Sequence, residues 1–267
     1  MWCDAGMVRR VDLADFLRAR RAAITPAQAG LVAGGRRRTP GLRREEVALL
    51  AGVSVSWYTW LEQGRPINVS VEVLDALGRV LQLDPVEQAY VAELTGHQAP
   101  RSEPVRRPEV PPWAHHLLDV LEPAPAYLLG PSWDYLAWNP AQADLFPPLA
   151  TLEPRDRNLV WAMFAVPETR ELLVDWENDA RQVLSQFRAE TTAIRDDPAV
   201  VEMVARLQVA SPEFAAWWGQ HDVAAFTTRL RRFRGPGQGV RVFEYQQLVV
   251  AGAPDLRLVV QLPLASD

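Results

Sequence analysis

Hydroxyl groups and indole rings gather on one short segment, residues 54–60, with the sequence SVSWYTW. Ser56 and Thr59 can hydrogen-bond the edges of bases in the DNA major groove, and apolar side chains beside them can contact thymine methyl groups. Residues 1–70 contain eleven Arg and six acidic residues, a net charge of +5, although the whole chain carries −5. A basic segment on an acidic chain favours a nucleic-acid-binding module joined to a second, different part.

The candidate DNA contacts lie on this segment and on the arginines that precede it. The residues expected to face the bases are Val55, Ser56, Trp57, Thr59 and Trp60. The arginines expected to neutralise phosphates and release counterions are Arg36, Arg37, Arg38, Arg43 and Arg44. Glu62 is an acid close to this surface, and we expect it to pair with an arginine of the same domain instead of contacting a base.

The second half of the chain is rich in aromatic residues that neighbour polar ones, and seven of the ten tryptophans lie between residues 113 and 218. An apolar pocket with a few converging polar groups is the usual form of a small-molecule site. The aromatic candidates for its lining are Tyr127, Trp138, Trp161, Phe164, Trp176 and Trp217. The polar candidates for orienting a head group are Asn139, Arg157, Asn158 and His221, and an arginine would suit a carboxylate. Each of these aromatics is individually more typical of core packing than of a pocket, so both interpretations stay open.

No pattern in the sequence is typical of an enzyme. The chain has neither a Gly-rich phosphate loop nor a Gly-x-Ser-x-Gly nucleophile turn. The four histidines, His97, His115, His116 and His221, do not have the spacing of metal ligands with carboxylates. Cys3 is the only cysteine, which excludes an internal disulfide and a cysteine metal cluster. We therefore expect no catalytic residue, no metal site and no cofactor other than a sensed ligand.

The composition is that of a globular protein, with 48% hydrophobic and 23% charged residues, and 267 residues suffice for two domains. No run of about 18 apolar residues predicts a membrane span. The first residues, MWCDAGMVRRVDLADF, lack the apolar core of a signal peptide. We expect a cytoplasmic protein that has no membrane partner.

The elements that must position the hydroxyl-bearing segment are short helices. Helical spacing of apolar residues predicts a five-helix domain over 11–97, after a disordered or extended tail at 1–10, with helices at 11–24, 43–51, 54–63, 70–83 and 84–96. Gly52 is expected to end the second helix and Ser54 to cap the third. The side chains expected to point inward are Val47, Ala51, Val53, Tyr58 and Leu61, with the small Ala48 at the helix crossing. Such a pair is a helix-turn-helix, whose second helix enters the major groove.

A Pro-rich linker is expected over 98–112, followed by an α+β domain over 113–265. Alternating patterns predict two strands within 126–139 and a hairpin of strands at 239–250 and 255–264. The predicted helices of this domain are 113–121, 141–146, 155–165, 168–195, 197–208 and 211–219. Strands, then helices, then strands indicate an antiparallel sheet backed by helices.

The longest of these segments resemble a known family. RRRTPGLRREEVALLAGVSVSWYTWLEQG, with VLDALGRVLQLDPVEQAYVAELTG after it, is similar to the XRE-type, lambda-repressor-like helix-turn-helix domain of MmyB-like bacterial transcriptional regulators. EPAPAYLLGPSWDYLAWNPAQADLF, VDWENDARQVLSQFRAE and SPEFAAWWGQHDV resemble the family's C-terminal domain. The resemblance implies a mainly α DNA-binding domain, a PAS-like sensor and a fatty-acid-like ligand. Trp60 and the loop RPINVS depart from the family pattern, which leaves the preferred DNA sequence open.

We therefore expect a transcription regulator with double-stranded DNA and a small apolar ligand as partners. A homodimer is expected because one such module reads only a few base pairs and its operators are two-fold. The alternative is a module that grips a protein with the same helices, since exposed Trp57 and Trp60 suit a protein interface. A small-molecule enzyme built on the second domain is a third hypothesis.

Overall fold

The computed structural model describes residues 5–31, 40–97, 109–235 and 239–264 of the chain. Its internal contacts divide the chain into two units. The first comprises residues 1–102 together with Trp217–Ala224, and the second comprises residues 103–216 and 225–267. Within the described residues, none of the helices combines the length and the apolar character that crossing a lipid bilayer requires.

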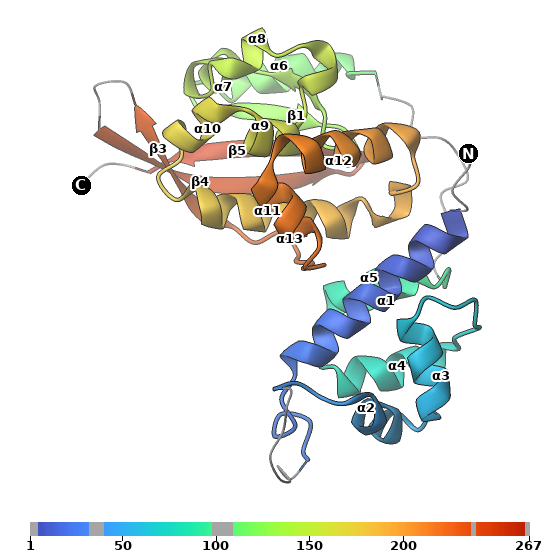
Figure 1. The fold of residues 1–267 in the computed structure, drawn as a ribbon. Helices are drawn as coiled ribbons and strands as arrows, with labels where there is room; N and C mark the ends of the chain where they lie inside the picture. The colour runs from blue at the N-terminus through green and yellow to red at the C-terminus, as the bar shows by residue number, and fades with distance from the viewer. Residues whose placement is uncertain (1–4, 32–39, 98–108, 236–238, 265–267) are drawn as a thin grey trace. The chain divides into compact units, whose positions relative to one another are not determined.

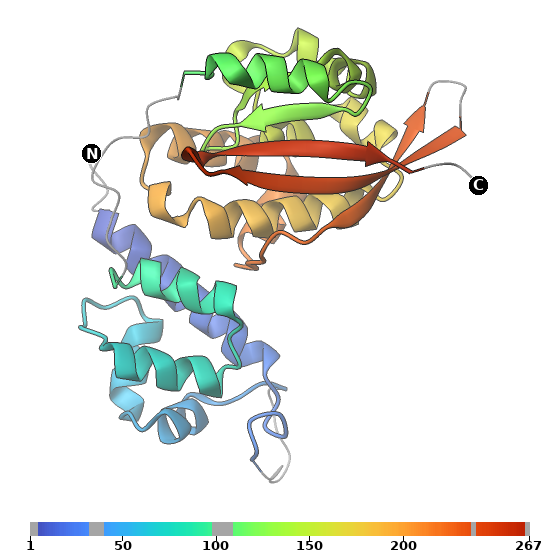
Figure 2. The same cartoon turned by 180° about the vertical axis from the view of Figure 1, so that it is seen from behind.

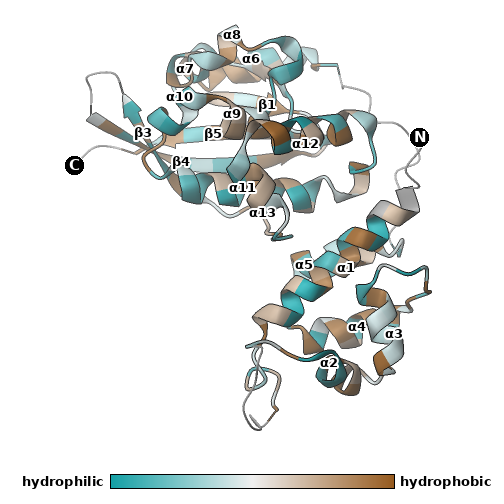
Figure 3. Ribbon diagram, in the orientation of Figure 1, coloured by the Kyte–Doolittle hydropathy of each residue, from teal (hydrophilic) through white to brown (hydrophobic). Residues whose placement is uncertain are grey.

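The first unit is built from the five expected helices, coloured blue to green in Figure 1. They are α1 (Ala5–Ala23), α2 (Arg44–Ala51), α3 (Val55–Glu62), α4 (Val71–Val80) and α5 (Pro85–Leu94). Hydrophobic and hydrophilic residues alternate along α1 in Figure 3, as they do in an amphipathic helix. Its apolar side is buried: Phe16 is in the core and packs on Tyr90, with ring centroids 5.2 Å apart.

The structure corrects the expected start of the first helix. We predicted a tail over residues 1–10 and Asp12 as an N-cap, whereas α1 already begins at Ala5, so Asp12 lies inside the helix. No proline or glycine lies between Met7 and Ala23, so nothing in the sequence interrupts the helix in this range. The other predicted caps are confirmed, because Ser54, Ser70 and Asp84 each accept a hydrogen bond from a backbone N–H of the helix that follows.

The second unit contains a five-stranded antiparallel sheet in the order β2-β1-β5-β4-β3. The strands are β1 (Ala126–Leu129), β2 (Tyr135–Trp138), β3 (Arg229–Gly235), β4 (Gly239–Val250) and β5 (Ala253–Pro263). The two predicted strand pairs are confirmed, and with the helices they give the expected α+β fold. Strand β3 was not predicted, because its sequence RLRRFRG hides the apolar alternation behind four arginines.

Helix α6 (Pro112–Val120) packs on one face of this sheet, where Ala114 and Leu118 contact the apolar side chains of β1 and β5 (Figure 2). The helical elements that follow β2 are α7 (Pro140–Leu145), α8 (Pro148–Thr151), η1 (Pro154–Asp156), α9 (Leu159–Ala165), α10 (Pro167–Leu172), α11 (Trp176–Glu190), η2 (Thr192–Ile194), α12 (Pro198–Ala210) and α13 (Pro212–Trp218). The single helix predicted over 168–195 is therefore wrong. It is interrupted because Leu173 forms a β-bridge with Phe233 at the edge of β3.

Candidate DNA-binding face and ligand cavity

A tight turn joins α2 to α3. Gly52 ends α2 with a φ of +71°, in the left-handed region that glycine adopts at little cost. The N–H of Val53 donates to the carbonyl of Ala48 at 2.9 Å, which closes the end of α2. The hydroxyl of Ser54 accepts from the N–H of Trp57 at 3.1 Å, which begins α3. These local bonds set the angle between the two helices of the predicted helix-turn-helix.

The two sides of α3 differ in exposure. Tyr58, Leu61 and Glu62 are buried, and α2 buries Val47, Ala48 and Ala51, as predicted; Val53 is half-buried. On the opposite side, Ser56 is exposed, and Val55 and Trp60 are each 42% exposed. Trp57 and Thr59 are half-buried, and the Thr59 hydroxyl donates to the carbonyl of Val55 at 2.8 Å. The predicted base-facing residues therefore form the outer side of α3, and their contact with DNA stays a prediction.

Glu62 is the centre of an ion-pair cluster that holds the helices together. Its carboxylate is fully buried and lies 2.5 Å from Nε of Arg21 in α1 and 2.6 Å from Nε of Arg44 in α2. Arg21 also donates to the carbonyl of Leu42 at 2.9 Å. Burial alone would raise the pKa of Glu62, but the hydrogen bonds from Arg21 and Arg44 lower it overall. The expectation that Glu62 pairs with an arginine of its own domain is confirmed.

The predicted phosphate contacts fall into three groups. Arg43 is exposed, and its backbone N–H donates to Glu46 at 2.7 Å, which leaves the guanidinium at the start of α2. Arg44 is directed to Glu62 and is 44% exposed, so its guanidinium is already committed to a partner inside the unit. Arg36, Arg37 and Arg38 lie outside the described residues. Sequence reasoning missed Arg65, an exposed residue whose guanidinium lies 5.8 Å from the ring centre of Trp60.

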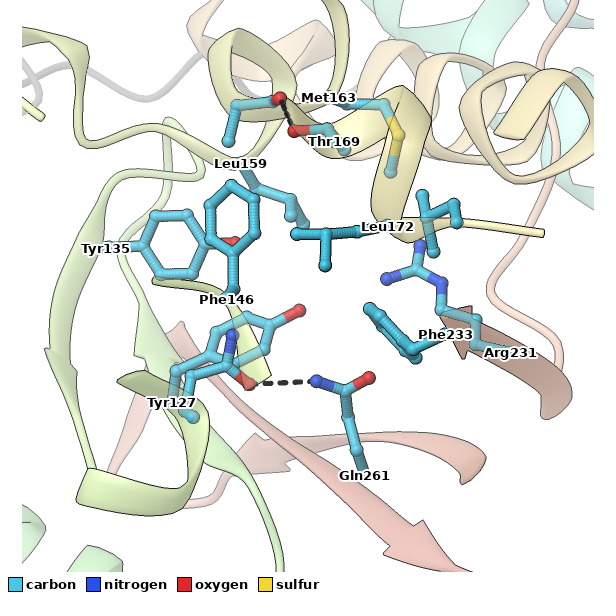
Figure 4. A pocket seen from close by; sticks show the side chains of 13 residues that line it. Tyr127, Tyr135, Phe146, Leu159, Met163, Thr169, Leu172, Arg231, Phe233 and Gln261 are labelled. Atoms are coloured by element: carbon cyan, nitrogen blue, oxygen red, sulfur yellow. Dashed lines mark hydrogen bonds between the residues drawn. The ribbon is translucent and has the colours of Figure 1, made fainter. Parts of the chain in front are cut away.

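The second unit contains a small cavity between the sheet and helices α7, α9 and α10 (Figure 4). Its volume is about 40 Å³. The residues that line it are Tyr127, Tyr135, Gln142, Phe146, Leu159, Ala162, Met163, Thr169, Leu172, Leu173, Arg231, Phe233 and Gln261. Most of these side chains are apolar, so the few polar groups among them decide what the cavity recognises.

Two polar groups of the lining keep an unused hydrogen-bonding atom. Arg231 points into the cavity in Figure 4 and is buried; its Nε donates to Asp179 at 3.2 Å, whereas its Nη2 has no hydrogen-bond partner. Gln261 donates through Nε2 to Gln142 at 2.8 Å, whereas its Oε1 has no partner. The hydroxyl of Tyr127 is 3.1 Å from that of Tyr245. Buried polar groups normally find partners, so these atoms indicate a site for a polar ligand group.

A pair of arginines surrounds one acid beside the cavity. Asp179 of α11 lies 3.2 Å from Nε of Arg231 and 3.9 Å from Nε of Arg229, two residues apart on β3. The two arginine side chains are only 4% and 11% exposed. Burial, together with the neighbouring Arg231, lowers the pKa of Arg229 to about 10. This cluster therefore holds one positive charge in excess.

Of the ten predicted ligand-binding residues, Tyr127 lines the cavity. Asn139 and Asn158 instead cap helices, with their side-chain oxygens accepting from Gln142 at the start of α7 and from Val160 at the start of α9. Their positions directly before helical segments were the signal for this structural role.

The other predicted residues make packing contacts outside the cavity lining. Arg157 stacks over Trp138 at 5.5 Å, and Arg206 stacks over Trp161 at 4.1 Å. Phe164 packs edge-to-face on Trp176, with ring centroids 6.0 Å apart. The remaining two, Trp217 and His221, belong to the segment grouped with the first unit. For these residues the packing interpretation, which the sequence left open, accounts for what the structure shows.

Comparison with known families identifies both units. Residues 110–267 match the family described as the MmyB-like transcription regulator ligand binding domain, which is more than half of the chain. Residues 12–91 match the helix-turn-helix domain family. A comparison with curated proteins finds none that matches the chain. A DNA-binding helix-turn-helix and a ligand-binding domain on one chain support a ligand-responsive transcription regulator. The chain belongs to the MmyB-like transcription regulators, as the resemblance of its longest segments predicted.

Proposed function

We propose that this regulator senses an amphiphilic carboxylate of fatty-acid type, with the carboxylate bound by Arg231 and the apolar tail held by the lining of the cavity. The observation that carries the proposal is a buried guanidinium whose Nη2 has no partner and faces an otherwise apolar cavity. An unpaired buried donor costs about 1–3 kcal/mol, and more when the group is charged. A carboxylate would accept from that Nη2 and would neutralise the excess positive charge of the cluster.

The apolar part of the lining supports a hydrocarbon tail. Leu159, Met163 and Leu172 contribute aliphatic side chains from α9 and α10, and Phe146 and Phe233 contribute rings. Gln261 offers a further polar atom, its Oε1, to a protonated or hydroxyl-bearing head group. A neutral ligand of the same length would leave Arg231 unsatisfied and is expected to bind more weakly.

The size of the cavity bears on the mechanism. A volume of about 40 Å³ holds one or two waters, whereas ligand sites usually have about 300–1,000 Å³. A tail can enter only if α9 and α10 move away from the sheet, and these are short helices that meet at Val166. The ligand would then favour an expanded arrangement of the second unit. Such a differential affinity is what lets a ligand change DNA binding.

The DNA side of the proposal rests on the outer surface of α3. Ser56 and Thr59 would read base edges, Val55 and Trp60 would contact thymine methyl groups, and Arg43 would bind a phosphate. Arg65 is added to the predicted phosphate contacts because its guanidinium lies beside Trp60. The pair of operator half-sites expected for this motif would be bound by two copies of the chain.

The ligand proposal is tested by thermal unfolding of the full chain with sodium dodecanoate, dodecanol or neither. Dodecanoate is expected to raise the Tm of the wild type more than dodecanol does, and Arg231→Met is expected to lower dodecanoate affinity about 10- to 100-fold. Arg206→Met is the matched control, because Arg206 stacks on Trp161 outside the cavity lining and should leave the affinity unchanged. Equal shifts for acid and alcohol, or an unchanged affinity in Arg231→Met, would overturn the assignment.

A protein-gripping module remains the second candidate, because Val55 and Trp60 expose apolar surface on α3. A gel shift with the DNA upstream of the protein's own coding sequence separates the two functions. Specific retardation that Ser56→Ala weakens supports DNA reading by α3. No retardation at low salt, where phosphate contacts are strongest, favours the protein partner.

A further inference from the structure

The sheet of the second unit is only half covered on the face that carries α6. Along β5, Leu256, Leu258 and Val260 point to this face and are buried in the cluster formed with α6. The next residue on the same face, Leu262, is 42% exposed. In Figure 2, which shows this face, α6 lies along β1 and leaves β4 and β5 uncovered.

The uncovered half presents a continuous apolar surface across three strands. Glu244 of β4 is paired with Leu230 on β3 and with Leu262 on β5, so these three side chains form one row. The next row contains Arg232 and Val242, with Leu264 hydrogen-bonded to Val242. Leu230 is 56% exposed and Leu264 is 42% exposed. Exposed apolar side chains that adjoin one another in this way mark an interaction surface.

Helix α6 extends this surface. Trp113 and Val120 are both exposed and lie seven positions apart, which places them two turns apart on one side of the helix. The strand rows alone span roughly 300 Å², from three strands about 4.8 Å apart and rows about 6.7 Å apart. A stable dimer buries about 800 Å² on each partner. The sheet patch is therefore the centre of a contact that includes its surroundings, α6 among them.

The charges on this patch complement each other under two-fold symmetry. Arg232 is exposed on β3 and makes no ion pair within the described residues. Glu244 is half-buried on the adjacent strand, one row away, and accepts a hydrogen bond from Gln246 at 2.5 Å. A two-fold axis through the patch brings Arg232 of each copy to Glu244 of the other. The same pair then forms twice, as an isologous interface requires.

We infer that the half-covered face of the β5-β4-β3 sheet, centred on Leu230 and Leu262, is the surface through which two copies of this chain associate. The inference rests on the proposed function only in that a two-fold DNA site needs two copies. It is independent of the ligand, whose cavity lies on the other face of the sheet: Gln261, which lines the cavity, alternates along β5 with Val260 and Leu262.

The test is sedimentation equilibrium of the full chain from about 0.1 to 100 μM. The wild type is expected to dimerise, and Leu230→Glu combined with Leu262→Glu is expected to weaken dimerisation at least tenfold. Val209→Glu is the matched control, because Val209 is 89% exposed on α12 and should leave the dimer intact. A monomeric wild type, or a Leu230/Leu262 variant as dimeric as the control, would overturn the inference.

Charge reversal tests the pairing without altering an apolar side chain, which guards against a variant that fails to fold. Arg232→Glu alone and Glu244→Arg alone are each expected to weaken the dimer severalfold. The double reversal is expected to restore it to within about twofold of the wild type. A double variant no better than the weaker single one would overturn the two-fold pairing. The dodecanoate shift should persist in every monomeric variant, so its loss in a dimeric protein would count against the ligand proposal alone.

Discussion

The two units each bury one acid between two arginines, and the comparison of these clusters separates a structural role from a binding role. In the first unit Glu62 holds Arg21 and Arg44, and Arg44 reaches solvent with 44% of its side chain exposed. In the second unit Asp179 lies near Arg229 and Arg231, whose side chains are 11% and 4% exposed. Residue types and net charge are the same, and only access to water differs.

That difference decides where the excess positive charge goes. Water solvates the guanidinium of Arg44, so the cluster around Glu62 is complete without a ligand. Beside Asp179 the charge stays in the interior, burial lowers the pKa of Arg229, and an Nη2 of each arginine has no hydrogen-bond partner. A buried ion cluster that is incomplete costs free energy, which an anionic ligand can recover. An acid–arginine pattern therefore predicts function only when the exposure of each member is known.

The largest effect is expected when the complete cluster is broken. Glu62→Gln leaves Arg21 and Arg44 without their charged partner, and we expect the free energy of unfolding to fall by about 3 kcal/mol. Chemical denaturation followed by circular dichroism measures it. Glu45→Gln, an exposed acid at the start of the same α2 helix, is the control and should change the stability by less than about 0.5 kcal/mol. A loss for Glu62→Gln as small as that of the control would remove the distinction between the clusters.

The comparison is sharpened by removing one arginine from each cluster. Arg21→Met should destabilise by about 2 kcal/mol, because Glu62 and the carbonyl of Leu42 lose a donor. Arg229→Met should be neutral or stabilising by up to about 1 kcal/mol, because it removes a buried charge that is poorly paired. Both values come from the same denaturation measurement. Equal destabilisation by the two substitutions would mean that the second cluster is as complete as the first.

Acid should weaken the first cluster in a defined direction. The pKa of folded Glu62 lies below its ordinary value of 4.5, so the unfolded chain takes up the proton first as the pH falls. The stabilisation is therefore fully present above about pH 4.5 and is lost as the pH drops through the lower pKa of the folded state. Unfolding free energies measured between pH 6 and 3 should fall less steeply in Glu62→Gln than in the wild type. Parallel curves would show that Glu62 does not contribute.

The smallest effect concerns the arginines at the start of α2. Arg43→Ala should reduce the slope of log K against log salt for DNA binding by about one, as expected for the loss of one phosphate contact. Arg44→Ala should reduce the slope less, because Glu62 already holds its guanidinium. Filter binding at several salt concentrations measures both slopes. The reverse order would show that DNA draws Arg44 away from Glu62.

The first unit was predictable because its signals are local. Apolar spacing gave the five helices, and Gly52, Ser54, Ser70 and Asp84 marked their ends, since caps and turns depend on residues within a few positions. The partner of Glu62 was predicted in kind but not by name. Arg21 is 41 residues away, and no local pattern indicates which arginine reaches it.

The candidate ligand site shows the opposite case. The sequence marked tryptophans and polar neighbours, yet Asn139, Asn158, Trp161 and Trp176 serve as caps and packing residues. Arg231 and Gln261 escaped notice because each lies among other polar or charged residues on an alternating strand, where only the pairing of strands shows which face is inward.

The sequence by itself determined the family, the helix-turn-helix and the α+β class of the second unit, because periodicity, caps and turns are written in neighbouring residues. Tertiary structure alone decided which charged residues are buried, which polar atoms lack partners and which half of the sheet α6 leaves uncovered. Those properties depend on contacts between residues far apart in the chain, and desolvation, which sets their energies, exists only once the chain has folded.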